Sequence, residues 1–223
     1  MNGIFNDIVS LLQATILVVA ALFPIVNPIG SAAVFLAMVD RFNPDLQRLL
    51  SKKIAIHSFF LLFLSMFCGS RILSFFGISL YSVQVGGGLI VVSNGWLLLT
   101  DGRQSGATVP TPKDVLAQAF YPFTLPITVG PGSISVAVAV GAHLHTQLKS
   151  ISIVSPSVLV VQVIGALILS FTIYLCYRWA RAAGRLLGDV GTTVLMRLSS
   201  FILLCIGVQI VAGGIRGYVA TLH

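Results

Sequence analysis

The sequence contains no glutamate and carries little charge of either sign. Six aspartates are its only acidic residues, and charged residues make up 9% of the 223 positions, against 57% hydrophobic residues. A water-soluble domain of this length has far more charge on its surface. The mean hydropathy of +1.00 agrees with this comparison. The composition therefore excludes an ordinary soluble domain and indicates an integral membrane protein.

The few acidic and sulfur-containing residues exclude several kinds of chemistry. Asp40, Asp101 and Asp189 lie at the ends of apolar runs or between them, so no run carries a carboxylate proton relay at its centre. There is no HExxH sequence and no Ser/His pair at a convincing spacing, so we do not expect an enzyme. The three cysteines show no CxxC spacing, and we predict no disulfide framework, metal site or cofactor.

The 13 lysines and arginines do not indicate nucleic-acid binding, because they lie between the apolar runs without interleaved aromatic residues. None of them precedes Arg41. The first apolar run therefore lacks the basic region that begins a cleavable signal peptide, and we expect it to remain as a membrane span.

Six apolar units follow one another along the chain and leave little sequence between them. Several exceed the roughly 18 residues that mark a membrane-spanning helix. We predict an all-α, polytopic helical membrane protein that forms a single transmembrane domain over residues 1–223. The predicted units cover residues 8–39, 49–73, 78–100, 115–145, 151–177 and 194–215.

The first and fourth units are too long for one straight crossing and contain helix breakers. Residues 8–39 would form a helix of about 48 Å, against a hydrocarbon core of about 30 Å. The breakers lie in FPIVNPIGSAAVF, residues 23–35, and in FTLPITVGPGSISV, residues 123–136. Broken helix survives in a membrane only where it is buried in protein or lines a polar cavity.

The two broken segments align with each other at a constant offset of 102 residues, with Pro24 opposite Pro126. Pro, Ile, Gly, Ser, Val and Ala coincide in this alignment. It divides the six units into three plus three, so we predict an internal duplication with repeats over about 1–103 and 104–223. A repeat of three spans enters the membrane upside down in its second copy, which predicts an inverted repeat.

The distribution of basic residues predicts the orientation. If each unit crosses once, ten lysines and arginines fall on one side and three, Arg71, Lys149 and Arg216, on the other. The positive-inside rule then places both termini outside the cytoplasm. This expectation would change if the broken units were re-entrant hairpins.

Each break creates a new helix start inside the membrane. We expect these starts at Gly30-Ser31 and at Gly132-Ser133, with free N–H groups and partial positive charge that suit a carboxylate. The two serines could cap the starts or direct a hydroxyl at a ligand. Further donors and acceptors nearby come from Asn27, Thr124 and Thr128. The alternative is a pair of proline kinks that neighbouring helices satisfy.

Other polar residues in the spans leave two interpretations open. His57 could titrate as a proton-coupling group, although we expect an interfacial histidine. Gln84, Gln162 and Gln209 could line a pathway or form hydrogen bonds between helices. The glycines at 86–88 and 95 are expected to permit close helix packing.

The chain resembles the MarC family of integral membrane proteins. The resemblance rests on NPIGSAAVFLAM, GISLYSVQVGGGLIVVSNGW, FTLPITVGPGSISV and RLSSFILLCIGVQIVAGGI. It implies six spans, the bacterial inner membrane, membership of the LysE-like exporter assemblage, and transport of small neutral amino acids. The matching motif residues are Asn27, Pro28, Gly30, Pro126, Thr128, Gly130, Pro131 and Gly132.

These observations predict a secondary transporter that holds a small neutral amino acid near the bilayer midplane, between the two broken helices. A non-transporting assembly partner or sensor, or a channel, is the alternative. The expected partners are the small solute and the lipid bilayer; coupling to Na⁺, to H⁺ or to neither stays open, as does the oligomeric state. The predicted substrate-binding residues are Asn27, Pro28, Gly30, Ser31, Thr124, Pro126, Thr128, Gly130, Gly132 and Ser133.

Overall fold

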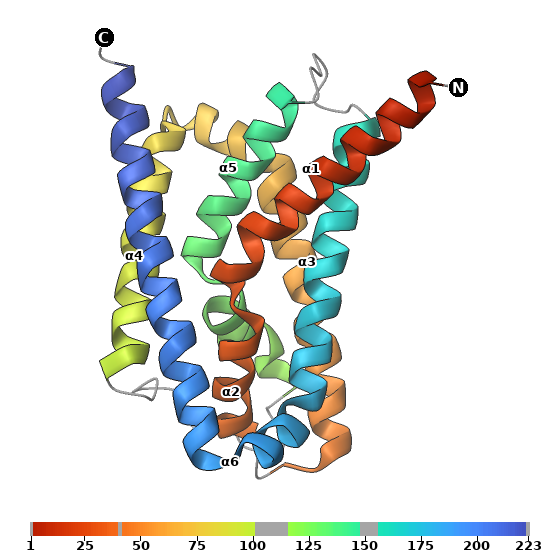
Figure 1. Ribbon diagram of the computed structural model, residues 1–223, viewed down its shortest axis with the longest axis vertical. Helices are drawn as coiled ribbons and strands as arrows, with labels where there is room; N and C mark the ends of the chain where they lie inside the picture. Colours follow the sequence, from red (N-terminus) through yellow and green to blue (C-terminus); the bar gives the residue numbers. More distant parts are fainter. Residues whose placement is uncertain (1, 40–41, 101–115, 148–155, 222–223) are drawn as a thin grey trace.

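The computed structural model describes residues 2–39, 42–100, 116–147 and 156–221. Every regular element within these residues is helical, which confirms the predicted all-α class (Figure 1). The elements are α1 (Asn2–Val26), α2 (Pro28–Val39), α3 (Pro44–Phe75), α4 (Leu80–Thr100), the short turn η1 (Ala117–Ala119), the irregular helix η2 (Phe120–Thr128), α5 (Pro131–Gln147) and α6 (Pro156–Ala220).

Within the described residues, five helices are long and apolar enough to cross a membrane. A sixth span results if Ala117–Thr128 and Pro131–Leu144, which meet at a bend of 72°, are counted together. Two of the five belong to α6, and we call them its first arm (Pro156–Gly188) and its second arm (Val190–Ala220). The predicted units thus correspond to observed helices, with different boundaries.

The predicted boundary between the fifth and sixth units was wrong. We expected the fifth unit to end at residue 177 and the sixth to begin at 194, but the helix continues to a reversal at Gly188, where φ is 65°. The intervening RWARAAGRLL is polar enough to leave the hydrocarbon, yet arginine, alanine and leucine are strong helix formers. Glycine then allows the left-handed conformation that turns the chain.

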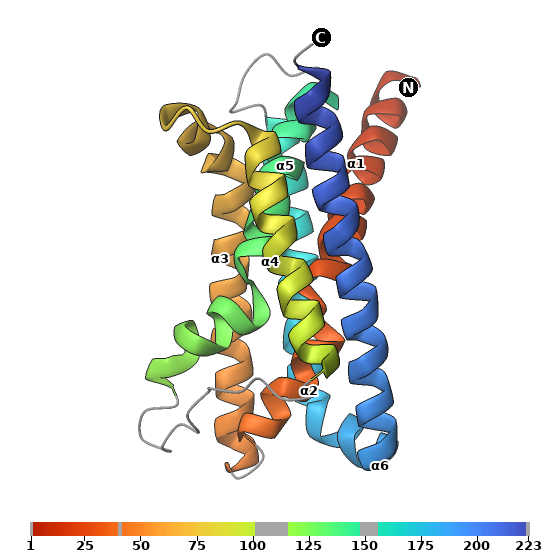
Figure 2. The ribbon, with the colours of Figure 1, turned by 90° about the vertical axis from the view of Figure 1, so that its left-hand side faces the viewer.

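Both termini lie at the same end of the bundle (Figure 1). The chain runs away from that end in α1 and α2 and returns in α3. It then descends in α4, rises in α5, and descends and rises again in the two arms of α6 (Figures 1 and 2). The short helix η2 lies beside the lower half of α3 (Figure 2).

The centre of the bundle is an aromatic cluster directly beside the helix breaks. The Phe35 ring stacks on the Tyr177 ring at a centroid distance of 4.5 Å and meets the Phe123 ring edge-on at 5.9 Å. All three side chains are fully buried. Because they come from α2, α6 and η2, this cluster fixes the two broken segments against the first arm of α6.

Helix α4 packs against the second arm of α6 at backbone distance. A Cβ atom on Gly88 would lie 3.1 Å from the carbonyl oxygen of Gly207, and one on Gly95 would lie 2.8 Å from the amide nitrogen of Leu204. The expectation of close packing is therefore confirmed at these glycines. A Cβ on Gly86 would meet nothing within 4 Å, so that glycine is not explained by packing.

Candidate functional site

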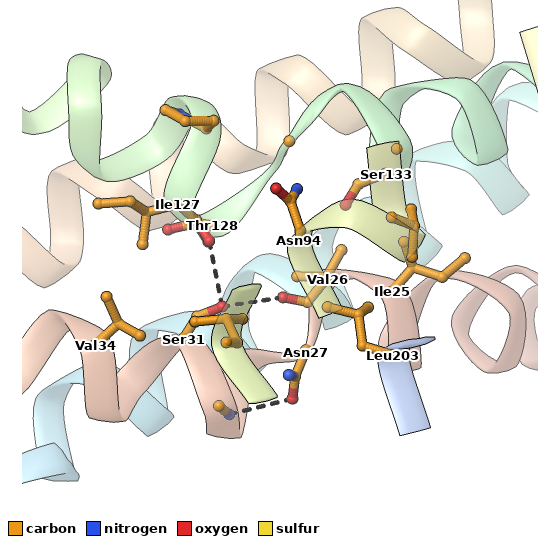
Figure 3. A pocket seen from close by; sticks show the side chains of 16 residues that line it. Ile25, Val26, Asn27, Ser31, Val34, Asn94, Ile127, Thr128, Ser133 and Leu203 are labelled. Atoms are coloured by element: carbon orange, nitrogen blue, oxygen red, sulfur yellow. Dashed lines mark hydrogen bonds between the residues drawn. The ribbon is translucent and has the colours of Figure 1, made fainter. Parts of the chain in front are cut away.

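Residues from both helix breaks line one pocket in the middle of the bundle (Figure 3). The Ser31 hydroxyl joins them directly, because it lies 3.3 Å from the carbonyl oxygen of Ile127 in η2 and 3.3 Å from that of Val26 in α1. The pocket has a volume of about 60 Å³. Its lining residues are Ile25, Val26, Asn27, Gly30, Ser31, Val34, Val91, Asn94, Leu98, Pro126, Ile127, Thr128, Gly130, Gly132, Ser133 and Leu203.

Eight of the ten predicted site residues line this pocket. The exceptions are Pro28, which is buried beside it, and Thr124, whose hydroxyl donates to the carbonyl oxygen of Ala119 at 2.7 Å. The structure brings together the others: Asn27, Gly30, Ser31, Pro126, Thr128, Gly130, Gly132 and Ser133. None of the lining residues among the described part of the chain is ionisable.

Helix α2 begins at Pro28, two residues before the expected start at Gly30-Ser31. Asn27 adopts φ of 45°, and its Oδ1 atom accepts a hydrogen bond from the Gly30 N–H at 3.2 Å. The Ser31 N–H donates to the Asn27 carbonyl oxygen at 2.9 Å. Asn27 is therefore the N-cap and Pro28 the first helical residue, a favoured pairing. Capping was one of the two roles left open for Ser31, and the structure gives that role to Asn27 instead.

The glycine at position 30 makes room for this cap. A Cβ atom on Gly30 would overlap Nδ2 of Asn27 and lie 2.9 Å from its Cγ. Asparagine is also one of the few residues that tolerate the left-handed conformation seen at position 27. The NPxG sequence thus acts as one capping motif: the asparagine caps the helix, and the glycine leaves room for the asparagine amide.

Helix α5 begins without such a cap. It starts at Pro131, one residue before the expected Gly132-Ser133. The Ile134 N–H donates to the Gly130 carbonyl oxygen at 3.0 Å. The N–H groups of Gly132 and Ser133 have no hydrogen-bond acceptor within the described residues, and the Ser133 hydroxyl has no partner there either. Both residues are buried and line the pocket, so the positive end of α5 meets it uncompensated.

Tyr177 is a residue beside the site that the sequence analysis missed. Its hydroxyl lies 2.7 Å from Thr128 Oγ1, which is 2.7 Å from the Phe123 carbonyl oxygen. A threonine hydroxyl has one proton, and a carbonyl can only accept it, so Tyr177 donates to Thr128. This bond ties α6 to the end of η2. In the sequence Tyr177 looks like an interfacial aromatic residue before Arg178, and only the fold places it inside.

We expect Tyr177→Phe to lower the free energy of unfolding by about 0.5–1.5 kcal/mol, the net value of one hydrogen bond. The Tyr177→Leu variant should lose more, because it also removes the ring that stacks on Phe35. Thermal unfolding in detergent measures both changes. Equal stability of wild type and Tyr177→Phe would show that the bond to Thr128 contributes nothing.

Asn94 in α4 is the second residue that was missed. It lines the pocket on the side of Ser133, away from Ser31 (Figure 3). The signal was present in the sequence, because a primary amide within an apolar span is expensive unless it faces protein or a polar cavity. Leu203 in the second arm of α6 completes the same wall.

The remaining polar candidates lie outside the pocket. The His57 ring meets the Phe120 ring edge-on at a centroid distance of 5.6 Å. Gln162 is fully buried, and its Nε2 atom donates to the Met66 carbonyl oxygen at 3.3 Å, so it forms a hydrogen bond between helices. Gln84 lines a separate hollow together with His143.

Comparison with known proteins identifies the family. The profile described as MarC family integral membrane protein matches residues 12–219. A UPF0056 membrane protein of Archaeoglobus fulgidus is 27% identical over 87% of this chain and 88% of its own length. The UPF0056 inner membrane protein MarC of Salmonella typhimurium is 28% identical over 96% of this chain and 99% of its own. No solved structure matches the chain significantly. The chain belongs to the MarC family and is a multi-pass integral protein of the inner membrane.

Proposed function

We propose that the chain is a secondary transporter of a small neutral amino acid, which it holds in the pocket between its two broken helices. The observation that carries the proposal is the uncapped start of α5, whose buried residues Gly132 and Ser133 line the pocket with N–H groups that have no acceptor in the described residues. Such a helix start is a receptor for an anion. A carboxylate would bind these two N–H groups and the Ser133 hydroxyl.

The absence of charged side chains from the described lining of the pocket favours a zwitterion as the solute. A solute with a net charge would need an opposite charge nearby to offset its lost hydration, and the described lining contains none. An amino acid brings its own balance, because its ammonium group is attached one carbon from its carboxylate. The Asn94 side chain lines the same pocket and offers an oxygen acceptor to that ammonium group.

The volume of the pocket favours a very small solute. Drug-sized ligands occupy pockets of about 300–1,000 Å³, whereas this pocket measures about 60 Å³ and holds about two water molecules at roughly 30 Å³ each. A solute of five or six heavy atoms would therefore require some further opening. Transporters of broken-helix architecture open and close around such a site as they alternate between the two sides of the membrane.

The predicted inverted repeat belongs to the same proposal, with repeats over about 1–103 and 104–223. It is supported by the position of the two breaks, which are 102 residues apart in sequence and line one pocket. An inverted repeat brings equivalent breaks together near the midplane. The repeats have diverged at this point, since Asn27 caps α2 while Val129 in the equivalent position leaves α5 uncapped.

The orientation of the chain also remains a proposal. The basic residues of α3 lie mainly in its first turns, and those of the first arm of α6 lie just before Gly188. Both segments are at the end of the bundle opposite the termini (Figure 1). The positive-inside rule therefore makes that end cytoplasmic and the termini periplasmic.

The test is uptake of radiolabelled glycine, alanine and serine by proteoliposomes that contain the purified protein. We expect Ser133→Ala to weaken apparent affinity about tenfold or more, because a hydrogen bond to a charged group contributes about 1.5–3 kcal/mol. Asn94→Ala should impair uptake as well. The matched control is Ser93→Ala, since Ser93 is exposed on the same helix and does not line the pocket.

The same vesicles separate the remaining alternatives. A Na⁺ gradient or a pH gradient imposed across the membrane identifies the coupling ion, and uptake that follows neither gradient indicates uncoupled movement. Passive flux without saturation would indicate a channel. Absence of flux for all three amino acids, or flux that both pocket variants leave intact, would contradict the proposal and favour a non-transporting protein.

A further inference from the structure

A second hollow lies on the outside of the bundle, between α3 and the first arm of α6, which pack side by side (Figure 1). This α3–α6 groove has a volume of about 740 Å³, which is far larger than the central pocket. Its lining residues are Asp45, Arg48, Leu49, Lys52, Ala55, Ile56, Phe59, Leu167, Ser170, Phe171 and Tyr174.

One end of the α3–α6 groove is basic. Arg48 and Lys52 belong to the early turns of α3 and are exposed. Arg178 does not line the groove itself but lies next to it, because its guanidinium donates to the hydroxyl of the lining residue Tyr174 at 3.3 Å and is 6.0 Å from the centre of that ring. None of these three cations forms an ion pair within the described residues. Asp45 lines the same end, so the local balance is three positive charges against one negative charge.

The rest of the α3–α6 groove is apolar. Its walls are the exposed side chains of Leu49, Ile56, Leu167 and Phe171, and its floor includes the buried Ala55. From Asp45 to Phe59 the groove follows α3 for 14 residues, about 21 Å at 1.5 Å per residue. One leaflet of hydrocarbon is about 15 Å thick. The groove therefore reaches from the interface into the hydrocarbon by roughly the length of an acyl chain.

We propose that the α3–α6 groove binds an anionic glycerophospholipid of the membrane. The phosphodiester lies among Arg48, Lys52 and Arg178, and one acyl chain follows the apolar floor between α3 and α6. Charge complementarity selects the lipid, because guanidinium and ammonium groups bind phosphate oxygens, while the rest of the groove offers mainly apolar contact to a chain. The Ser170 hydroxyl, buried at the floor without a hydrogen-bond partner in the described residues, is the one polar group along that path. This site is separate from the central pocket and does not depend on transport.

The test is native mass spectrometry of the purified protein in detergent, titrated with phosphatidylglycerol or phosphatidylcholine of identical chains. We expect phosphatidylglycerol to bind more tightly. Arg48→Gln and Lys52→Gln should each weaken it about fivefold, as expected for one cation near an anionic lipid surface. Lys53→Gln is the matched control, because Lys53 is exposed beside Lys52 but does not line the groove.

Two further measurements distinguish the lipid from other occupants of the groove. Ala55→Leu adds volume to the groove floor without changing charge and should also weaken lipid binding, with thermal unfolding recorded to confirm that the variant is folded. Glycerol phosphate, the soluble headgroup, should not compete at equal concentration. The proposal fails if phosphatidylcholine binds equally well, if Lys53→Gln weakens binding as much as Lys52→Gln, if a folded Ala55→Leu binds like wild type, or if the headgroup alone displaces the lipid.

Discussion

Replacing Gly141 with alanine is expected to destabilise the protein by about 1–3 kcal/mol, the usual cost of overpacking a tight contact. A Cβ atom at position 141 would overlap the carbonyl oxygen of Met66 in α3 and lie 2.7 Å from its carbonyl carbon. These are backbone atoms, so no side-chain rotation can relieve the overlap. The same carbonyl accepts the hydrogen bond from Gln162 in α6, and a shift of α5 would disturb three helices together.

The measurement is thermal unfolding in detergent, followed by circular dichroism, with Gly86→Ala as the control. A Cβ atom at Gly86 meets nothing within 4 Å, so that substitution gains helix propensity without a clash and should be neutral or slightly stabilising. If Gly141→Ala melts at the same temperature as Gly86→Ala, then α3 and α5 do not approach each other as closely as described.

The second large effect concerns the NPxG capping motif, and we expect the effects of Asn27 and Gly30 to be strongly non-additive. Gly30→Ala should lower the free energy of unfolding because its Cβ atom displaces the Asn27 amide from its capping position. Asn27→Ala should cost about 1–2 kcal/mol, since it removes the cap and places alanine in a left-handed conformation.

The double variant Asn27→Ala/Gly30→Ala should be no less stable than Asn27→Ala alone, because the amide that clashes with the new Cβ atom is gone. A double-mutant cycle on unfolding free energies measures this coupling. Simple addition of the two single effects would mean that Gly30 is needed for a reason other than the cap. Gly86→Ala in α4, outside the pocket and without a clash at its Cβ atom, provides an unrelated second site against which to compare the coupling.

The helices themselves could be predicted from the sequence because the bilayer imposes a simple rule on hydropathy and length. Local pattern also located both breaks, since proline and glycine act through the backbone of their own segment. The turn between the arms of α6 could not be placed in the same way. Its arginines and alanines satisfy helix propensity and interfacial polarity together, so neither property marks the residue at which the helix ends.

The site was predictable where it depends on the broken segments and unpredictable where it depends on neighbouring helices. The capping role of Asn27 could have been predicted, because asparagine before proline at a helix start is a capping pattern. The sequence analysis instead assigned Asn27 to ligand binding. Asn94 and Tyr177 were missed for another reason. Their positions relative to the breaks follow from how α4 and α6 pack, and no local spacing encodes that packing.

The origin of the pocket lining has a consequence for how the protein is made. The first lining residue along the chain is Ile25 and the last is Leu203, so most of the sequence lies between them. A ribosome-bound chain that has inserted only α1 and α2 contains the first break without α4, η2, α5 and α6, which supply other lining residues of the pocket. The lining of the pocket is therefore complete only after the second arm of α6, which supplies Leu203, has been synthesised.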